Sequence, residues 1–156
     1  MPTLFYALFV TEVKAQRFAG NSNTPVPMGG ISRSHTGNSG YSNGSVNVSL
    51  QEGCSWSHVQ IYGITNGGDA GSSTAQCTAV LKDGTSIQLD RYVGKNLSSP
   101  GRTTFISNKL TAAQIANLDH IVCYAYAQGG YGSTGNKTGY AGAYVYGTRI
   151  PWVVDE

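Results

Sequence analysis

The sequence has little charge. Lysine, arginine, aspartate and glutamate make up 12% of its 156 residues, about half the usual share. The basic residues are scattered, and no run of lysine or arginine occurs. A nucleic-acid-binding surface needs a basic patch or stripe. The sequence therefore predicts no nucleic-acid partner.

Groups suited to catalysis are also few. The sequence holds eight carboxylates, of which Asp83 falls in a predicted turn, Asp119 follows a predicted helix, and two lie at the C-terminus. Glycoside hydrolysis needs two carboxylates that face each other across a cleft, and no motif selects a pair from the others. A G-x-S-x-G nucleophile elbow is absent from the sequence. We therefore predict a protein that is not an enzyme and has no catalytic residues. A hydrolase of unrecognised type is the third alternative.

Cysteine and histidine do not form a metal-binding motif. The three cysteines include no C-x-x-C pair, and no histidine lies two or four positions from another. Asp69 stands alone in a glycine-rich loop, whereas a calcium site gathers several carboxylates. We predict no metal and no cofactor. Buried free thiols are the favoured state of the cysteines, with one disulfide as an open alternative. The cysteines are Cys54, Cys77 and Cys123, and the histidines are His35, His58 and His120.

No apolar run approaches the roughly 20 residues that span a membrane. The first ten residues, MPTLFYALFV, lack a basic n-region and a convincing cleavage site. The sequence therefore predicts synthesis in the cytoplasm without a signal peptide and no membrane insertion. Thr3 to Val13 is apolar on both sides, which predicts a strand covered by the core on one face and by another subunit on the other.

Glycine, tyrosine and alternating apolar residues are abundant instead. The alternation predicts strands at Ser45 to Leu50, Trp56 to Ile64 and Thr74 to Leu81, with His58 facing outward on the second. Asp83-Gly84 is the signal of a tight hairpin turn that returns the chain through Ile87 and Leu89.

A short helix and a tyrosine-rich hairpin are predicted in the C-terminal third. Thr111 and Gln114 have the spacing of a capping box, which predicts a helix of about two turns. The strand from His120 to Gln128 is expected to pair with Tyr140 to Tyr146. The segment Gly129 to Gly139 is expected to be an exposed loop at the tip, because its glycines cannot pack a core.

The expected architecture is all-β. About eight short strands with one short helix favour an antiparallel β-sandwich, of jelly-roll or galactose-binding-like type. Residues 1–156 are expected to form a single domain. Residues 15–44 lack periodicity and carry many turn signals, which predicts an irregular arm ordered by contacts to other chains.

The tyrosines supply the candidate binding site. Tyr131, Asn136, Lys137 and Tyr140 offer aromatic faces, an amide and a cation at the predicted hairpin, which suits a protein or glycan partner. The alternative is that the tyrosines form a cross-strand ladder that only stabilises the hairpin. Both interpretations stay open.

The segment from Gly101 to Gln128 resembles part of the β-sandwich virion proteins of tailed bacteriophages. The resemblance lies in a T-x-F strand, then Leu-Thr-x-Ala-Gln-Ile-x-x-Leu, then a long apolar strand. It implies a virion structural protein with no catalytic residue, either a capsid decoration protein or a tail or fibre subunit. Its partners would be copies of itself, other virion proteins and a cell-surface glycan. A carbohydrate-binding, lectin-type module is the alternative.

Overall fold

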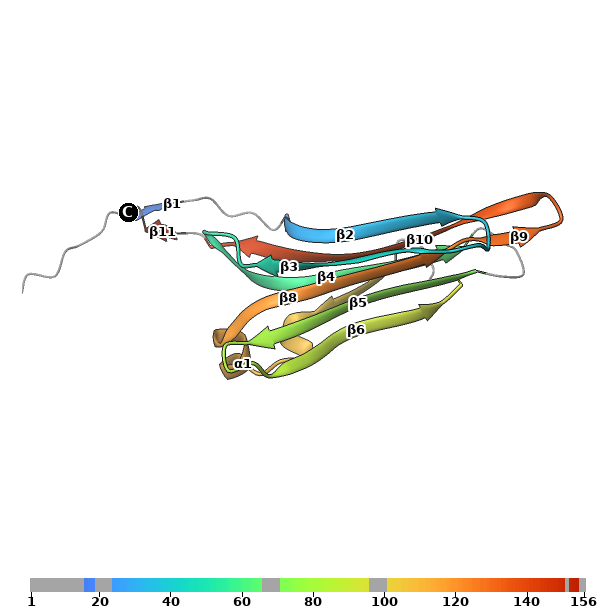
Figure 1. Ribbon diagram of the computed structural model, residues 1–156. Coiled ribbons are helices and arrows are strands. Elements are labelled where there is room, and N and C mark those ends of the chain that lie inside the picture. The colour runs from blue at the N-terminus through green and yellow to red at the C-terminus, as the bar shows by residue number, and fades with distance from the viewer. Residues whose placement is uncertain (1–15, 19–23, 66–70, 96–100, 151, 155–156) are drawn as a thin grey trace, which may run out of the picture.

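The chain folds as a sandwich of two antiparallel sheets (Figure 1). The computed structural model describes residues 16–18, 24–65, 71–95, 101–150 and 152–154. One sheet has the order β2-β10-β4-β7 and the other the order β3-β8-β5-β6. The predicted all-β sandwich with one short helix is confirmed.

The bounds of the elements follow in chain order. They are β1 (Gln16–Phe18), β2 (Val26–Thr36), β3 (Ser42–Ser49), β4 (Cys54–Thr65), β5 (Ser72–Leu81), β6 (Ser86–Gly94), β7 (Arg102–Phe105), the 3-10 helix η2 (Ile106–Asn108), α1 (Ala112–Ala116), β8 (Leu118–Gln128), β9 (Gly130–Gly132), β10 (Gly135–Arg149) and β11 (Trp152–Val154). In addition, β9 pairs with β10, and β1 pairs with β11. The predicted strand at Thr3 to Val13 and the loop residue Asp69 lie outside the described residues.

The core is built from small and β-branched side chains at alternate strand positions. Along β8, the inward residues Ile121, Cys123, Ala125 and Ala127 are all fully buried, as the alternation predicts. Ala75, Cys77 and Ala79 of β5 and Ala141, Ala143 and Val145 of β10 are buried in the same way. Small residues on both inner faces allow the two sheets to approach closely.

The hairpin between β5 and β6 forms as predicted. The Leu81 amide donates to the Thr85 carbonyl at 2.8 Å, and the Thr85 amide donates to the Asp83 carboxylate at 2.9 Å. Gly84 has a φ of +88°, a conformation that glycine adopts without strain. The turn is therefore determined by local sequence.

The capping box of α1 is also confirmed. The Gln114 amide donates to the Thr111 hydroxyl at 3.2 Å, and the Thr111 amide donates to the Gln114 side-chain oxygen at 2.8 Å. Leu110, just before the cap, is 4% exposed, and Ile115 packs against the core. The cap thus fixes a helix of only five residues between β7 of one sheet and β8 of the other.

Replacing Thr111 with alanine is expected to lower the free energy of unfolding by about 1 kcal/mol, the usual loss for an N-cap oxygen. Urea denaturation of the full chain measures this change. Ser107→Ala is the matched control, because Ser107 is exposed in η2 and the 3-10 helix has no side-chain cap. Equal midpoints for wild type and Thr111→Ala would show that the cap contributes nothing.

The described residues within 15–44 do not form an irregular arm, and that prediction is wrong for them. Most of these described residues lie in β2 and the start of β3, and β2 pairs with β10 along almost its whole length. The inward positions of β2 do not form a row of apolar residues, because β2 is the edge strand of its sheet. Ile31 is buried there, whereas the Arg33 guanidinium donates to the Asn43 carbonyl of β3 at 3.2 Å. β2 therefore shows no apolar alternation by which its sequence could be recognised.

The predicted pairing of β8 with β10 is also wrong. β8 lies between β3 and β5, and β10 lies between β2 and β4, in the other sheet. The chain passes from one sheet to the other at Gly129. A Cβ atom there would lie 2.3 Å from the Lys137 carbonyl oxygen and 2.6 Å from the His35 carbonyl oxygen. The crossing depends on glycine because three backbone segments meet at this point.

All three cysteines are free and buried, which confirms the favoured prediction. Cys77 and Cys123 lie directly opposite each other on β5 and β8, with their sulfur atoms 3.9 Å apart. The hydrogen bond to Cys123 and burial both raise the pKa of the Cys77 thiol. Cys77 therefore packs as a neutral thiol in the core.

Candidate functional site: two charge-poor sheet faces

The outer face of the β2-β10-β4-β7 sheet carries aromatic, hydroxyl and amide side chains. We call it the tyrosine face. Its positions alternate with the buried residues of the same strands, and neighbouring strands bring them into rows. The described residues of this face include Ser32, Ser34, Thr36, His58, Gln60, Tyr62, Ile64, Thr103, Phe105, Thr138, Tyr140, Tyr144 and Tyr146, and none of these is acidic or basic apart from the histidine.

Two tyrosine rings lie flat on this face because glycines lie beneath them. A Cβ atom on Gly142 would lie 2.2 Å from Cε1 of Tyr62, and one on Gly30 would lie 2.3 Å from Cδ1 of Tyr144. The centroids of the two tyrosine rings are 6.1 Å apart, and their planes differ by 21°. We call these two nearly parallel rings the platform.

His58 is covered by its aromatic neighbours. Its ring stacks on Tyr146 at 4.8 Å, with 9° between the planes, and lies 5.6 Å from Phe105. Only 6% of His58 is exposed, although the sequence predicts an outward-facing position. Burial lowers the pKa of His58, which favours the neutral form near pH 7. His58 therefore adds no charge to the tyrosine face under these conditions.

The hydroxyl of Tyr62 interacts with the side chains of Tyr144 and Ser32. Burial, together with the hydrogen bond to Tyr144, raises the pKa of Tyr62 to about 12, against a smaller opposing effect of the Ser32 hydroxyl. The phenol stays neutral at physiological pH. The platform thus presents rings and hydroxyl groups only.

The predicted binding residues lie in a hairpin rather than an irregular loop. Tyr131 of β9 lies opposite Asn136 of β10. Asn136 and Tyr140 occupy alternate positions of β10 and so share one side of the strand. Tyr131 is 56% exposed and Tyr140 is 40% exposed. Lys137 lies on the other side of β10, where its amine donates to the Thr134 hydroxyl.

The hairpin therefore extends the tyrosine face through Tyr131, Asn136 and Tyr140, and it separates Lys137 from them. Binding by these residues stays a prediction. Sequence reasoning missed Tyr62 and the glycines beneath the platform. The alternation of glycine and tyrosine in GYAGAYVY was the available signal, but the glycines acquire their role only through strands that are distant in sequence.

The outer face of the β3-β8-β5-β6 sheet is rich in amides and hydroxyls, and we call it the amide face. Its described residues include Asn43, Ser45, Asn47, Thr74, Gln76, Thr78, Val80, Gln88, Arg91, Val93, His120, Val122, Tyr124 and Tyr126. Arg91 is the one acidic or basic residue among these apart from His120, and its guanidinium donates to Gln76 at 3.2 Å. This face is therefore polar but nearly uncharged.

Large side chains protrude at two sides of the amide face. Tyr41 is 60% exposed and stacks on Tyr126 with 5.2 Å between the ring centroids. Val93 on β6, at the opposite side, is 50% exposed. Exposed apolar groups on a charge-poor surface are typical of a contact with another molecule.

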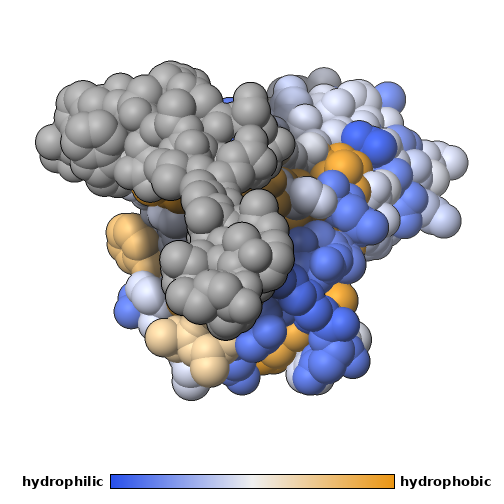
Figure 2. All heavy atoms as spheres, turned by 90° about the vertical axis from the view of Figure 1, so that its left-hand side faces the viewer, coloured by the Kyte–Doolittle hydropathy of each residue, from blue (hydrophilic) through white to orange (hydrophobic). Residues whose placement is uncertain are grey.

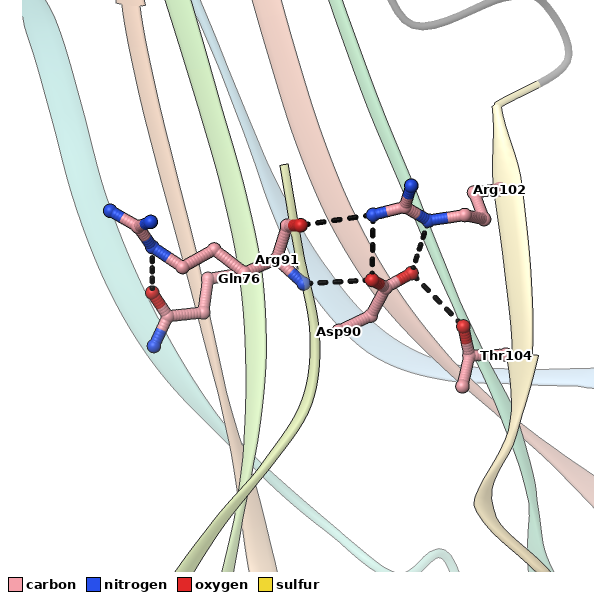
Figure 3. A network of polar contacts seen from close by, with 5 residues as sticks. All are labelled: Gln76, Asp90, Arg91, Arg102 and Thr104. Carbon is pink, nitrogen blue, oxygen red and sulfur yellow. Dashed lines mark hydrogen bonds and ion pairs between the residues drawn. The ribbon is translucent and has the colours of Figure 1, made fainter. Parts of the chain in front are cut away.

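Asp90 is engaged in joining the two sheets rather than free for chemistry. Arg102 of β7 donates two hydrogen bonds to the Asp90 carboxylate of β6, at 2.7 and 2.8 Å, and Thr104 donates a third at 3.0 Å (Figure 3). Burial opposes ionisation of Asp90, but the hydrogen bonds from Arg102 and Thr104, with the charge of Arg102, hold its pKa below the ordinary value. The ion pair closes the sandwich along the β6–β7 side.

The other described histidines also have local partners. His120 lies 2.7 Å from the carboxylate of its neighbour Asp119. The ring of His35 accepts a hydrogen bond from the Gly129 amide at the crossing. Within the ranges that the structure describes, no three residues of the ligand types His, Cys, Asp and Glu are grouped to hold a metal ion.

An open hollow of about 640 Å³ lies at the end that carries α1. Its lining residues are Leu81, Lys82, Asp83, Thr85, Ala113, Gln114 and Asn117. Gln114 is used in the helix cap, and Asn117 donates to the Ala113 carbonyl. Hydrophilic and hydrophobic patches alternate on this end of the molecule (Figure 2). The hollow therefore offers few free polar groups to a ligand.

No family model matches the chain, and no curated protein matches it. A chain from a solved structure of infectious bursal disease virus, Gt strain, is similar at a TM-score of 0.35 and 10% sequence identity. The match covers 83% of this chain and 35% of the viral chain, so the present chain spans about a third of that protein. A TM-score of this size does not establish a common topology. Among the described residues, no helix is long and apolar enough to cross a membrane.

Proposed function

We propose that this protein is a non-enzymatic virion structural protein, a capsid decoration protein or a tail or fibre subunit. Copies of itself and other virion proteins would pack against its amide face in the assembled particle. The observation that carries the proposal is the amide face, a nearly uncharged sheet surface at which Tyr41 and Val93 are exposed.

Surface charge supports this assignment. Packing a charged side chain into an interface removes it from water at a cost, and interface cores are depleted of charged residues. Hydroxyl and amide groups can instead form hydrogen bonds to a neighbouring subunit. Four strands of such positions can supply the roughly 800 Å² that each partner contributes to a stable interface.

The segment that resembles phage virion proteins has the order that the resemblance implies. A short strand, β7, is followed by the capped helix α1 and the long apolar strand β8. The capped helix bridges two strands that belong to different sheets. This agreement supports a virion role and leaves the choice between capsid and tail open.

The absence of enzymatic activity is part of the proposal. Asp90 and Arg102 hold the two sheets together, His58 is covered by aromatic rings, and His35 accepts from the backbone at the crossing. Removing these groups from their present bonds would disturb the sandwich itself. Their use in structure supports a role in assembly rather than in catalysis.

Ser45→Lys is expected to disrupt assembly while leaving the fold intact. Ser45 is exposed at the amide face, and a lysine there would have to be desolvated in a packed interface. We expect the dissociation constant for self-assembly to rise about tenfold or more, a change equivalent to one unpaired polar group. Sedimentation velocity of the full chain measures it.

Ser107→Lys adds the same charge at an exposed position of η2, away from the amide face, and is expected to assemble like the wild type. Equal assembly of the Ser45→Lys variant and the wild type would contradict the proposed interface. Near-ultraviolet circular dichroism verifies that both variants keep the native packing.

A further inference from the structure

We propose that the tyrosine face is a binding surface for a neutral glycan, with Tyr62 and Tyr144 as its stacking platform. This function goes beyond subunit packing, and it uses the opposite face of the sandwich from the amide face.

The orientation of the rings favours a sugar as the ligand. The rings of Tyr62 and Tyr144 lie over Gly142 and Gly30, so each crosses the sheet surface where the glycine leaves room for it. The face of an aromatic ring carries partial negative charge. The C–H groups on one side of a pyranose ring carry partial positive charge and can lie flat on such a surface. Two nearly parallel rings with centroids 6.1 Å apart offer adjacent aromatic groups to consecutive sugar units.

Polar groups beside the platform can bind sugar hydroxyls. Gln60 and Thr103 lie next to Tyr144 in the same cross-strand row, and the Gln60 amide donates to the Thr103 hydroxyl at 3.2 Å. This bond fixes the amide and leaves its carbonyl oxygen as an acceptor. On the other side of the platform, Ser32 and Ser34 are exposed on β2. The arrangement combines an apolar floor with hydroxyl and amide groups, as small-molecule sites do.

The lack of charge selects a neutral ligand. A nucleic acid or an acidic polysaccharide gains much of its affinity from lysine and arginine, and the described residues of the tyrosine face include neither. The described cations Arg33 and Arg102 belong to the inner edges of β2 and β7, where they bond to the opposite sheet. The face thus offers stacking and hydrogen bonding without an electrostatic attraction for anions.

The β9–β10 hairpin lengthens the surface. Tyr140 lies four positions from Tyr144 on the same side of β10, about 13 Å along the strand, and Tyr131 with Asn136 continues beyond it. An extended oligosaccharide could contact both the platform and the hairpin. Lys137 takes no part, because it lies on the other side of β10.

Binding of neutral and sialylated oligosaccharides to the full chain on a glycan array tests the proposal. We expect the chain to bind at least one class of neutral oligosaccharide. We expect no binding that requires a negatively charged sugar. For that glycan, Tyr62→Ala and Tyr144→Ala should each weaken affinity about tenfold, the effect of removing one stacked ring. Tyr41→Ala, which removes an exposed tyrosine of the amide face, should leave affinity unchanged.

A second measurement does not depend on the variants being stable. In the wild-type chain, the tyrosine ring protons that shift in NMR spectra on adding the glycan should be those of Tyr62, Tyr144 and Tyr140. Binding that shifts only Tyr41 and Tyr126, or no binding of any neutral glycan, would overturn the proposal. Self-association through the tyrosine face would overturn it too. Loss of assembly in Ser45→Lys with glycan binding retained would show that the two functions are separate.

Discussion

Gly129→Ala is expected to lower the free energy of unfolding by about 3 kcal/mol, at the upper end of the range for overpacking. The added methyl group would lie 2.3 Å from the Lys137 carbonyl oxygen and 2.6 Å from the Gly37 nitrogen and the His35 carbonyl oxygen. These are backbone atoms of two other segments, and they cannot move aside as a side chain can. The substitution would also strain the hydrogen bond from Gly37 to Lys137, at 2.9 Å. Chemical denaturation of the full chain measures the loss.

Gly84→Ala is the control that separates crowding from backbone strain. Gly84 has a φ of +88°, and nothing lies within 4 Å of an added Cβ atom. Its substitution should cost only the strain of the left-handed conformation, about 1 kcal/mol. A cost for Gly129→Ala no greater than that for Gly84→Ala would contradict the close crossing of the three segments.

Asp90→Ala is expected to cost about 2 kcal/mol at pH 7, in the range for hydrogen bonds to a charged group. The substitution leaves Arg102 and Thr104 without their common acceptor (Figure 3) and opens the β6–β7 side of the sandwich. The larger penalty for a fully buried ion pair does not apply, because the Arg102 side chain is 44% exposed. Asp119→Asn, at an exposed carboxylate, should change stability by about 0.5 kcal/mol or less.

The contribution of Asp90 should depend on pH in a defined direction. Its pKa in the folded chain lies below the ordinary value, so the native state favours the ionised carboxylate. The stabilisation is fully present above the unfolded pKa of about 3.9 and is lost as the pH falls through the lower folded value. The stability difference between wild type and Asp90→Ala should therefore shrink on acidification below about pH 4. A difference that stays constant down to pH 2 would contradict the ion pair.

Features specified by neighbouring residues were predictable from the sequence. The Asp83-Gly84 turn and the Thr111–Gln114 capping box each depend on a few adjacent positions, and both formed as predicted. The buried face of β8 was equally recognisable, because its small and apolar residues alternate strictly. These rules specify a strand or a turn without knowledge of its neighbours.

Features that depend on distant contacts were not predictable in this way. β10 pairs with β2 and β4 because the chain changes sheets at Gly129, and a single sequence does not show where such a crossing lies. The sequence of β2 predicts an arm because it lacks periodicity and carries turn signals, and its apolar alternation is interrupted where Arg33 occupies an inward position. The platform was missed because Tyr62 needs Gly142 from another strand beneath it. The predicted site at Tyr131, Asn136 and Tyr140 captured only the hairpin end of this surface.

The mass of the particle from which the protein is purified in its natural source, with the identities of the co-purifying proteins, tests the structural role most directly. The account predicts that the full chain is recovered in an assembly of many subunits together with other virion proteins. In that assembly, hydroxyl-radical footprinting should show Tyr41 and Val93 protected relative to the dissociated chain. Recovery as a free monomer, with both residues equally reactive before and after dissociating treatment, would contradict it.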